Sequence, residues 1–243
     1  MQPATNKNLA IVGYGKMGKL IEQLAPQFGF DVKLKLDVAD NPHGQGITAA
    51  TFSGIHAAIE FSTPETAPEN LTKLAELRVP TVTGTTGWTN RLAQVTSAVD
   101  SNGSGLVWSP NFSVGVAVFR RLVAAAAELL RNEDAYGAWA WEIHHDQKKD
   151  APSGTLLHLV EAMKSAGYKR AIDVSSNRAG LHPGTHEIGF DSGADTITLR
   201  HTARNREGFA SGALKSAQWI MGRTGVHTFE EVLFGIDKQF QGE

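Results

Sequence analysis

The sequence predicts an α/β protein, with a Rossmann-like, doubly wound parallel sheet and a second domain that contains a mixed sheet. Two observations favour this fold class. From Leu9 to Trp108, short apolar runs alternate with amphipathic segments, which is typical of strands and helices wound into a parallel sheet. After Pro110 the pattern changes to one long apolar helix, and then to β-rich segments separated by turns that contain Gly and Pro.

The first part of the chain supplies the parallel sheet. Helical spacing of apolar residues predicts a helix over Lys16–Phe28 and a second helix that begins at Pro64. The predicted strands are Leu9–Val12, the alternating run Val32–Leu36, Ala57–Phe61, Thr81–Thr83 and Leu106–Trp108.

The second part predicts a separate domain. Val114–Asn132 is expected to form one long, largely buried helix. The β-rich segments are Ala138–His145, Thr185–Phe190 and Asp195–Ala203, which suggest a mixed or antiparallel sheet. A final helix over Ser211–Met221 is expected to end at Gly222, because glycine favours the left-handed conformation of a helix C-terminus.

Composition narrows the classes of function. The 243 residues carry a formal net charge of −2, so no general attraction to nucleic acid or to an anionic membrane is expected. The absence of cysteine excludes disulfides, thiolate metal sites and cysteine nucleophiles. No targeting segment or bilayer-spanning apolar run is recognised, and we therefore expect a cytoplasmic protein.

A glycine-rich turn follows the first predicted strand and opens the first helix. Gly13, Gly15 and Gly18 stand in G-x-G-x-x-G order, which allows a tight turn, close approach of a pyrophosphate and close packing of helix on strand. Asp37 closes the second strand, where a carboxylate can bind a ribose diol. The alternative is a purely structural turn. Because Val38 brings no charge to a 2′-phosphate, we slightly favour NADH over NADPH, although Lys33 and Lys35 leave both cofactors open.

Two further loops follow predicted strands, at the end where parallel sheets bind ligands. They are FSTPE (Phe61–Glu65) and GTTGW (Gly84–Trp88). Their small residues would let a flat cofactor ring lie close to the backbone. Equally, each loop is explained as a capped turn before a helix.

The stretch EIHHDQKKDAPSGT, Glu142–Thr155, concentrates titratable side chains. His144 and His145 follow an apparent strand and should point to opposite faces, and Lys148 can reach the same cleft as one of them. Ser153, Gly154 and Thr155 begin an amphipathic helix, whose N-terminus favours an anion. The pattern predicts a site for a carboxylate-bearing substrate, with histidine suited to general-acid catalysis.

Other interpretations of these side chains remain open. A single histidine is more often a surface or structural residue than a catalytic one. The histidines that a metal site could draw on are His144, His145, His158, His182, His186 and His201. They lack the spacing of a zinc-binding helix, so no metal site is expected. Asp150 is expected to cap a helix or to pair with a lysine.

The motifs IVGYGKMGKLI, FSTPE, GTTGW, SPNFSVGV and EIHHDQKKDAPSGT together resemble the 4-hydroxy-tetrahydrodipicolinate (dihydrodipicolinate) reductase family of the diaminopimelate route to lysine. RAG (Arg178–Gly180) and FASGALKSAQWI also match, so the resemblance covers nearly the whole chain. It implies NAD(P)H-dependent reduction of 4-hydroxy-tetrahydrodipicolinate to tetrahydrodipicolinate. It also implies a dinucleotide-binding domain over residues 1–112 and 206–243, and an inserted domain over residues 113–205 that binds substrate and whose open sheet forms a homotetramer.

The resemblance assigns residues by position. His144 and Lys148 are implied as the proton-delivering residues, and His145, Lys148, Ser153, Gly154 and Thr155 as ligands of the substrate carboxylates. The implied cofactor-binding residues are Gly13, Gly15, Lys16, Met17, Gly18, Asp37, Phe61, Gly84, Thr86, Ser109, Asn111 and Phe112. Asp146 and Gln147 depart from the family pattern and reduce the positive charge expected at the mouth of the pocket.

Two rival functions stay open on sequence grounds. Another nicotinamide enzyme acting on a small dicarboxylate or an amino acid would need a similar anion site. A non-catalytic dinucleotide sensor would keep the glycine turn but would not need His144 and Lys148. We expect the glycine turn and the histidine–lysine cluster to face each other across one crevice.

Overall fold

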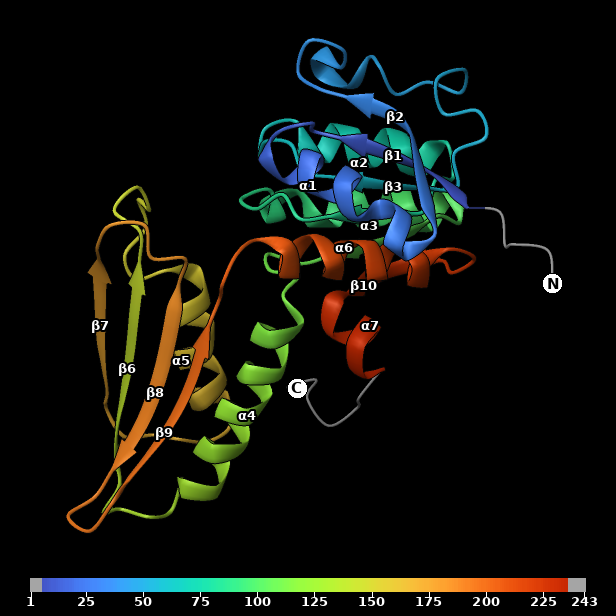
Figure 1. Ribbon diagram of the computed structural model, residues 1–243. Helices are drawn as coiled ribbons and strands as arrows, with labels where there is room; N and C mark the ends of the chain where they lie inside the picture. Colours follow the sequence, from blue (N-terminus) through green and yellow to red (C-terminus); the bar gives the residue numbers. More distant parts are fainter. Residues whose placement is uncertain (1–5, 236–243) are drawn as a thin grey trace, which may run out of the picture. The chain divides into compact units, whose positions relative to one another are not determined.

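The computed structural model describes residues 6–235, which divide into two compact units. The first unit contains residues 6–112 and 209–235, and the second unit is Ser113–Gly208. Each unit has its own sheet (Figure 1). Residues 236–243, which the sequence assigns to the dinucleotide-binding domain, lie outside the described residues.

The first unit is built on a six-stranded parallel sheet with the order β10-β5-β4-β3-β1-β2. Its strands are β1 (Lys7–Val12), β2 (Phe30–Leu36), β3 (Ala57–Glu60), β4 (Thr81–Thr83), β5 (Gly105–Trp108) and β10 (Gly225–Thr228). The predicted doubly wound α/β fold is confirmed. The edge strand β10 was not predicted, because four residues with a glycine and a histidine give little apolar signal.

Helices cover both faces of this sheet. They are α1 (Lys16–Leu24), α2 (Ala67–Glu76), α3 (Leu92–Asn102), α6 (Glu207–Ile220) and α7 (Phe229–Phe234). On one face, α2 and α3 pack through Leu71, Leu74 and Val95 onto the sheet. On the other face, Ile11 approaches α1 at Gly18, and Ile220 of α6 lies against Gly105.

Several predicted helix boundaries differ from the structure. The long helix ends at Leu130 rather than at Asn132, and the last predicted helix begins at Glu207 rather than at Ser211. The helix expected to run to Phe28 ends at Leu24 and continues as a 3-10 turn over Ala25–Phe28, because Pro26 cannot continue the hydrogen bonding of α1. The second helix begins at Ala67 rather than at Pro64. The carbonyl of Thr63 accepts hydrogen bonds from the amides of Thr66 and Ala67, and thereby closes a turn before the helix starts.

The second unit contains a four-stranded mixed sheet with the order β7-β6-β8-β9. Its strands are β6 (Gly137–His144), β7 (Ile172–Arg178), β8 (Thr185–Asp191) and β9 (Thr196–Thr202). β6 pairs with β7 in parallel, and the remaining pairs are antiparallel. The three predicted strands are confirmed to within one residue at each end, whereas β7 was missed because IDVSSNR is mostly polar and exposed.

Two helices, α4 (Val114–Leu130) and α5 (Gly154–Ser165), cover one face of this sheet (Figure 1). Phe119 and Val123 of α4 and Leu156 of α5 pack there against Ala140 and Ile188. In the described part of this unit no helix covers the other face, which carries the partly exposed side chains of Trp139, Trp141 and Ile143.

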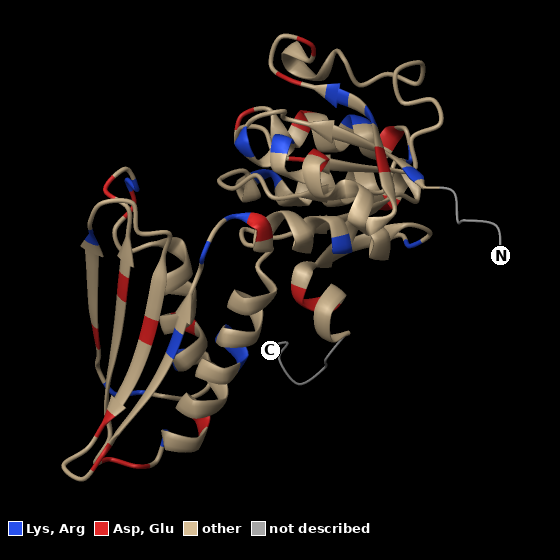
Figure 2. Ribbon diagram, viewed as in Figure 1, with Lys and Arg blue, Asp and Glu red and all other residues tan. Residues whose placement is uncertain are grey.

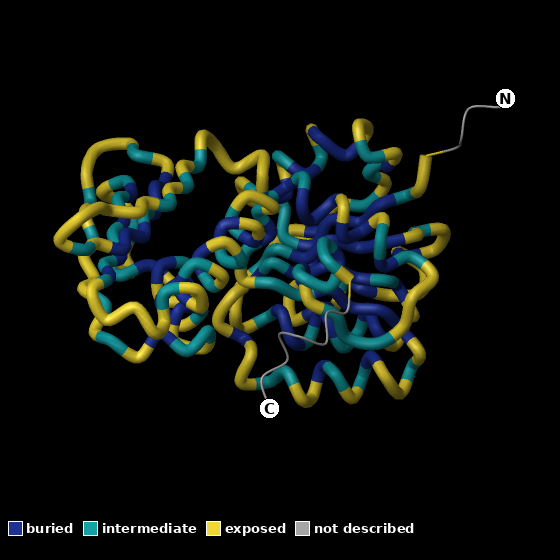
Figure 3. The backbone as a smooth tube through the Cα atoms, turned by 90° about the horizontal axis from the view of Figure 1, so that it is seen from below, coloured by how far each residue is buried: buried dark blue, intermediate teal, exposed yellow. Residues whose placement is uncertain are grey.

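The surface of both units is mixed in charge. Figure 2 shows Lys and Arg interspersed with Asp and Glu along the elements of each unit. Figure 3 shows buried stretches of the backbone in the interior of each unit and exposed stretches around its outside. Within residues 6–235, no helix combines the length and apolar character needed to cross a bilayer.

Candidate functional site

The glycine turn after β1 has the geometry that its spacing predicts. Gly13 has φ +93°, and a Cβ at this position would lie 2.1 Å from the carbonyl oxygen of Phe61. A Cβ at Gly18 would lie 2.5 Å from the carbonyl oxygen of Gly13, so α1 packs on β1 only with glycine there. At Gly15, the N-cap of α1, a Cβ would meet no atom within 4 Å. The backbone at Gly15 therefore borders open space at the helix start, beside the exposed Lys16 and the half-buried Met17.

The end of β2 presents a carboxylate and no free lysine. Asp37 and Val38 are both exposed, and the amide of Asp37 donates to the carboxylate of Asp40 at 3.2 Å. Lys35 pairs with Glu22 at 2.9 Å, and its ammonium lies 5.0 Å from the ring centre of Tyr14.

The hydroxyl of Tyr14 also donates to Glu22. These hydrogen bonds from Tyr14 and Lys35 lower the pKa of Glu22. Lys33 pairs instead with Asp31 at 3.6 Å.

The loops after β3, β4 and β5 meet at the carboxyl end of the sheet. A Cβ at Gly84 would lie 2.1 Å from the ring of Phe61, and the rings of Phe61 and Phe112 lie 6.4 Å apart. Ser109 accepts a hydrogen bond from the amide of Asn111 at 3.2 Å, which shapes the third loop. The structure thus brings Gly13, Phe61, Gly84 and Phe112 together, with Thr86 exposed beside them.

A buried carboxylate ties two of these loops together. Glu60 is fully buried at the end of β3 and accepts hydrogen bonds from Thr83 and Thr85 at 2.5 and 2.8 Å. It also accepts bonds from the amide, at 3.0 Å, and the hydroxyl of Ser62. Burial raises the pKa of Glu60, and the hydrogen bonds from these neutral groups oppose that rise only in part.

In the second unit, Glu142 and His144 share the helix-covered face of β6, because residues two apart on a strand point the same way. His144 Nδ1 lies 3.5 Å from Glu142 Oε2, and this nitrogen is buried without a hydrogen-bond partner. His186 of β8 approaches the same oxygen at 3.3 Å, and Arg178 of β7 pairs with Glu142 Oε1 at 2.9 Å.

The start of α5 is anchored to the same carboxylate. Ser153 caps the helix by accepting from the amide of Leu156 at 3.2 Å, and its own amide and hydroxyl both donate to Glu142. Gly154 and Thr155 form the first two positions of α5, where amide groups favour an anion. Lys148 pairs with Asp150 at 2.8 Å, which lowers the pKa of Asp150, as expected for a lysine partner.

The structure brings His144 to Glu142 and to the residues at the start of α5. His145 is half-buried, and its carbonyl accepts from the amide of Lys148 at 3.2 Å. Asp146 and Gln147 are exposed. The sequence did not predict that Glu142, Ser176, Arg178 and His186 belong to this cluster, although Glu142 opens the titratable stretch and His186 was named among the candidate histidines. The alternation of side chains along β6 could have revealed Glu142, because it points to the same face of the strand as Ala138, Ala140 and His144.

Burial and the neighbouring polar groups shift the pKa values of Glu142 and His144 in opposite directions. Burial lowers the pKa of His144 to about 4, although the nearby carboxylate of Glu142 opposes this shift. Burial alone would raise the pKa of Glu142, but hydrogen bonds from His186, Ser153 and Arg178 outweigh it and hold that pKa far below its ordinary value. Without a bound ligand, the cluster therefore holds a carboxylate and a neutral His144 at pH 7.

Glu142, His144 and His186 also have the side-chain types of a metal site, with potential ligand atoms within 4.8 Å of one another. Glu142 already accepts hydrogen bonds from Arg178, Ser176 and both polar groups of Ser153. We interpret the cluster as a hydrogen-bonded carboxylate, because a cation would have to displace these donors and sit close to the guanidinium of Arg178.

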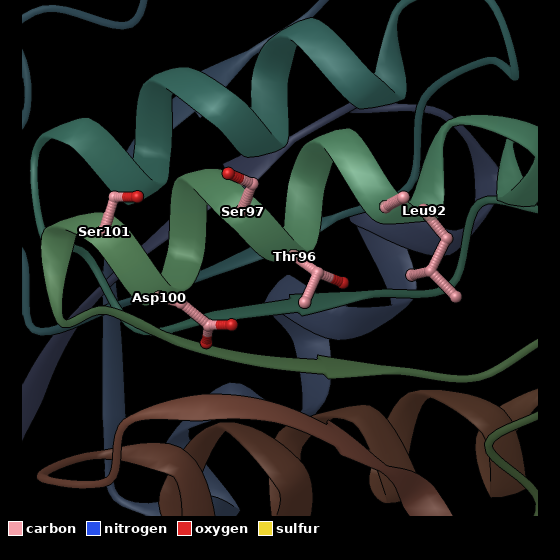
Figure 4. Close-up of a pocket in the computed structure, with 6 residues that line it drawn as sticks. Leu92, Thr96, Ser97, Asp100 and Ser101 are labelled. Atoms are coloured by element: carbon pink, nitrogen blue, oxygen red, sulfur yellow. The ribbon is translucent and has the colours of Figure 1, made fainter.

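A hollow elsewhere contains none of the expected site residues. It has a volume of about 620 Å³ and lies along α3, lined by Leu92, Ala93, Thr96, Ser97, Asp100 and Ser101. Figure 4 shows the lining side chains. The hollow is shallow and open to solvent, and four of its lining residues are small exposed or partly exposed side chains. We assign it no role.

Comparisons with known proteins give a consistent result for both units. Residues 7–112 match the family described as "Dihydrodipicolinate reductase, N-terminus", and residues 115–233 match "Dihydrodipicolinate reductase, C-terminus". A 4-hydroxy-tetrahydrodipicolinate reductase of Christiangramia forsetii is 33% identical over 242 residues, which cover 95% of this chain and 99% of the relative. One of Archaeoglobus fulgidus is 32% identical over 255 residues, covering 90% and 96%.

The fold also has a solved counterpart. A dipicolinate-bound dihydrodipicolinate reductase from Paenisporosarcina sp. TG-14 superimposes with a TM-score of 0.78 at 22% identity. The match covers 92% of this chain and 97% of that one. At this identity the likeness supports the fold.

Proposed function

The chain belongs to the dihydrodipicolinate reductase family, and from this membership we propose how its residues divide the reaction between its two units. Its activity is that of a 4-hydroxy-tetrahydrodipicolinate reductase, an NAD(P)H-dependent oxidoreductase of lysine biosynthesis. One observation supports this division of roles. The glycine turn lies in the first unit, whereas the cluster of Glu142, His144 and Ser153 lies in the second.

The first unit binds the dinucleotide. The residues at its glycine turn fit such a group, because Gly13 and Gly18 are closely packed whereas Gly15 borders open space. Lys16, Met17 and Asp37 would hold the phosphates and a ribose, and Phe61, Gly84, Thr86, Ser109, Asn111 and Phe112 would surround the nicotinamide end. When bound, the cofactor supplies the hydride.

The second unit binds the substrate and moves the proton. Lys148 and His145 contribute positive charge and hydrogen bonds to the substrate carboxylates, and the amides of Gly154 and Thr155 at the start of α5 complete the anion site. Dipicolinate, an aromatic dicarboxylate, is the natural probe of this site because it was found bound to the Paenisporosarcina relative. We assign residues 113–205 to this role and residues 1–112 and 206–243 to cofactor binding.

His144 is the general acid, with Lys148 as its partner in proton delivery. Since burial holds the pKa of His144 at about 4, the imidazole is neutral in the free protein at pH 7. Binding of a dianion beside it would favour the imidazolium, so substrate binding and proton uptake are coupled.

Replacing His144 by Gln tests this role. We expect turnover to fall by about two orders of magnitude, with the KM for NADH unchanged within about twofold. Replacing the exposed His158 of α5 by Gln is the matched control and should change neither value. Equal losses in turnover and in cofactor affinity in the His144 variant would contradict the assignment.

We propose that NADH is preferred over NADPH. Both lysines that could bind a 2′-phosphate are engaged, Lys35 by Glu22 at 2.9 Å and Lys33 by Asp31 at 3.6 Å, while the exposed Asp37 would repel such a phosphate. Glu22→Gln should release Lys35 and raise kcat/KM for NADPH several-fold, with little effect on NADH. Asp100→Asn, which neutralises an exposed carboxylate on α3, is the control for lost surface charge, and a wild-type preference for NADPH would refute the proposal.

The uncovered face of the second unit's sheet is the proposed contact surface of a homotetramer. Trp139, Trp141 and Ile143 lie on that face, partly exposed, and such apolar side chains favour association. Light scattering of the wild type and of Trp141→Glu measures this directly, and a monomeric wild type would exclude it. We place the protein in the cytoplasm, where its biosynthetic reaction takes place.

A further inference from the structure

Glu142 is the most heavily hydrogen-bonded carboxylate of the second unit's cluster. It is fully buried near the end of β6. Its Oε1 accepts from the amide of Ser153 at 2.8 Å, from Ser176 at 3.1 Å and from Arg178 at 2.9 Å. Its Oε2 accepts from the hydroxyl of Ser153 and lies 3.3 Å from His186. This one side chain therefore connects three strands to the start of α5.

Strand pairing fixes where this carboxylate sits. Glu142 pairs with Ser176 of β7 and with His186 of β8, so the three side chains form a row across the sheet. The row lies on the helix-covered face and is buried or half-buried. Because sheet register sets these positions, the carboxylate is held rigidly and does not depend on a loop.

His144 lies between this carboxylate and a glycine. A Cβ at Gly184 would come within 3.0 Å of Cδ2 and Nε2 of His144, so the ring lies close to the backbone there. On its other side, Nδ1 lies 3.5 Å from Glu142 Oε2. The two atoms form no hydrogen bond in the free protein, so the carboxylate acts on the ring through its negative charge. That charge favours the tautomer with the proton on the nearer nitrogen.

We propose that Glu142 is a positioning residue for the reduction: its carboxylate anchors Ser153 at the start of α5 and holds His144 with a proton on Nδ1. This inference rests on the proposed function, in which His144 delivers the proton from Nε2 and Gly154 and Thr155 bind a substrate carboxylate. Ser153 gives both of its hydrogens to Glu142, so it acts by placing Gly154 and Thr155 rather than by donating to the substrate.

The charges around His144 make the carboxylate necessary. Four titratable or charged groups act on it: Glu142 of β6 favours the imidazolium, whereas His186 of β8, Arg178 of β7 and Lys148 disfavour it. Among residues 6–235, the other charged groups that act on His144 all oppose its protonation, so without Glu142 the bound dianion would be left as the group that favours it. Removing the charge should therefore make His144 harder to protonate in the substrate complex.

Kinetics of four variants test the proposal. Glu142→Gln removes the charge at nearly constant shape, and Glu142→Asp keeps the charge but moves it. Glu161→Gln, an exposed carboxylate on α5, is the matched control, and His144→Gln reports on the acid itself. The readouts are kcat, the KM for NADH, the pH profile of kcat, and the melting temperature of the full-length protein.

We expect Glu142→Gln to lower kcat by about tenfold or more, with the KM for NADH nearly unchanged. The fall of kcat at high pH should begin about one pH unit lower than in the wild type. Glu142→Asp should lower kcat but keep the wild-type pH profile. A wild-type profile in Glu142→Gln, or an equal acid shift in Glu142→Asp, would overturn the proposal, because a purely structural role would not move the profile through charge.

The proposed role of His144 as the acid and the proposed role of Glu142 can be refuted separately. If His144→Gln keeps full activity, the assignment of the acid fails. If His144→Gln loses activity while Glu142→Gln does not, only the role of Glu142 fails.

A measurement on the wild type covers the case in which Glu142→Gln does not fold. The 15N shifts of the His144 ring, assigned by comparison with His144→Gln, report the tautomer at pH 7. The proposal requires a protonated Nδ1 and an unprotonated Nε2 in the free protein, and the opposite tautomer would overturn it.

Discussion

Ser153 donates both of its polar hydrogens to Glu142, its amide to Oε1 at 2.8 Å and its hydroxyl to Oε2. At the same time its Oγ accepts from the amide of Leu156 at 3.2 Å, as an N-cap does. One serine thus donates hydrogen bonds to a buried carboxylate on a strand and accepts one from an amide in the first turn of a helix.

Ser153→Ala should destabilise the second unit by about 1–3 kcal/mol, because a helix cap and a hydrogen bond to a buried carboxylate are lost together. Urea unfolding followed by circular dichroism measures this loss. Ser165→Ala, at the other end of α5, removes a hydroxyl that donates to the exposed Glu161 at 3.3 Å and should cost less than about 0.5 kcal/mol. Equal losses in both variants would show that the contact with Glu142 contributes nothing.

Stability should fall as the pH is lowered from about 6.5 to about 4, because His144 is neutral when folded and gains a proton on unfolding. Its folded pKa of about 4 lies below the ordinary value of 6.5, so the unfolded chain binds more protons in this window. The full effect is about 3 kcal/mol. His201, whose pKa burial also lowers, adds to it in the same direction.

Melting temperatures at pH 7 and pH 5 check this effect. The difference between them should shrink in His144→Gln. An unchanged difference in that variant would exclude His144 as its source.

Glu142 and Glu60, the two carboxylates that are fully buried within residues 6–235, should differ in how strongly neutralisation destabilises the protein. Glu142→Gln leaves Arg178 buried without its partner and should cost about 3–5 kcal/mol. Glu60→Gln removes a charge whose partners are neutral hydroxyls and an amide, and whose pKa burial raises. We expect its unfolding free energy to change by less than about 1 kcal/mol. Chemical denaturation at pH 7 compares the two, and an equal cost would contradict this difference.

Substitution of two glycines of the turn should affect different properties: Gly18→Ala the stability of the fold, and Gly15→Ala the binding of the cofactor. Gly18→Ala brings a Cβ to within 2.5 Å of the carbonyl oxygen of Gly13 and should lower the melting temperature by several degrees. Gly15→Ala meets no protein atom within 4 Å, so the fold should be kept while NADH affinity falls about tenfold or more. Calorimetry of NADH binding checks the second effect. A Gly15→Ala variant that binds NADH normally would show that the cofactor does not approach this backbone.

Much of the fold could be predicted because its strands are short apolar runs separated by turn residues. β4 was predicted residue for residue, and β6 to within one position at each end. The failures have physical causes. β7 is polar and exposed, so its place in the sheet depends on pairing with β6. At Pro64, a turn closed by the carbonyl of Thr63 delays the helix to Ala67.

The site was only partly predictable. Motifs identified His144, Lys148 and the start of α5, and the family matches confirm the resemblance on which their roles depend. The sequence could not identify the partners of Glu142, because Arg178 and His186 come from strands that are distant along the chain. Only strand pairing brings them to the carboxylate.

The first unit's sheet has consequences for how the protein is made. Its edge strand β10 pairs with β5, although Ser113–Gly208 separates the two parts of that unit along the chain. On the ribosome, the contiguous second unit emerges whole while the parallel sheet still lacks its last strand. Newly synthesised chains should therefore acquire protease resistance in the middle of the sequence first, and the capacity to retain a dinucleotide only near release.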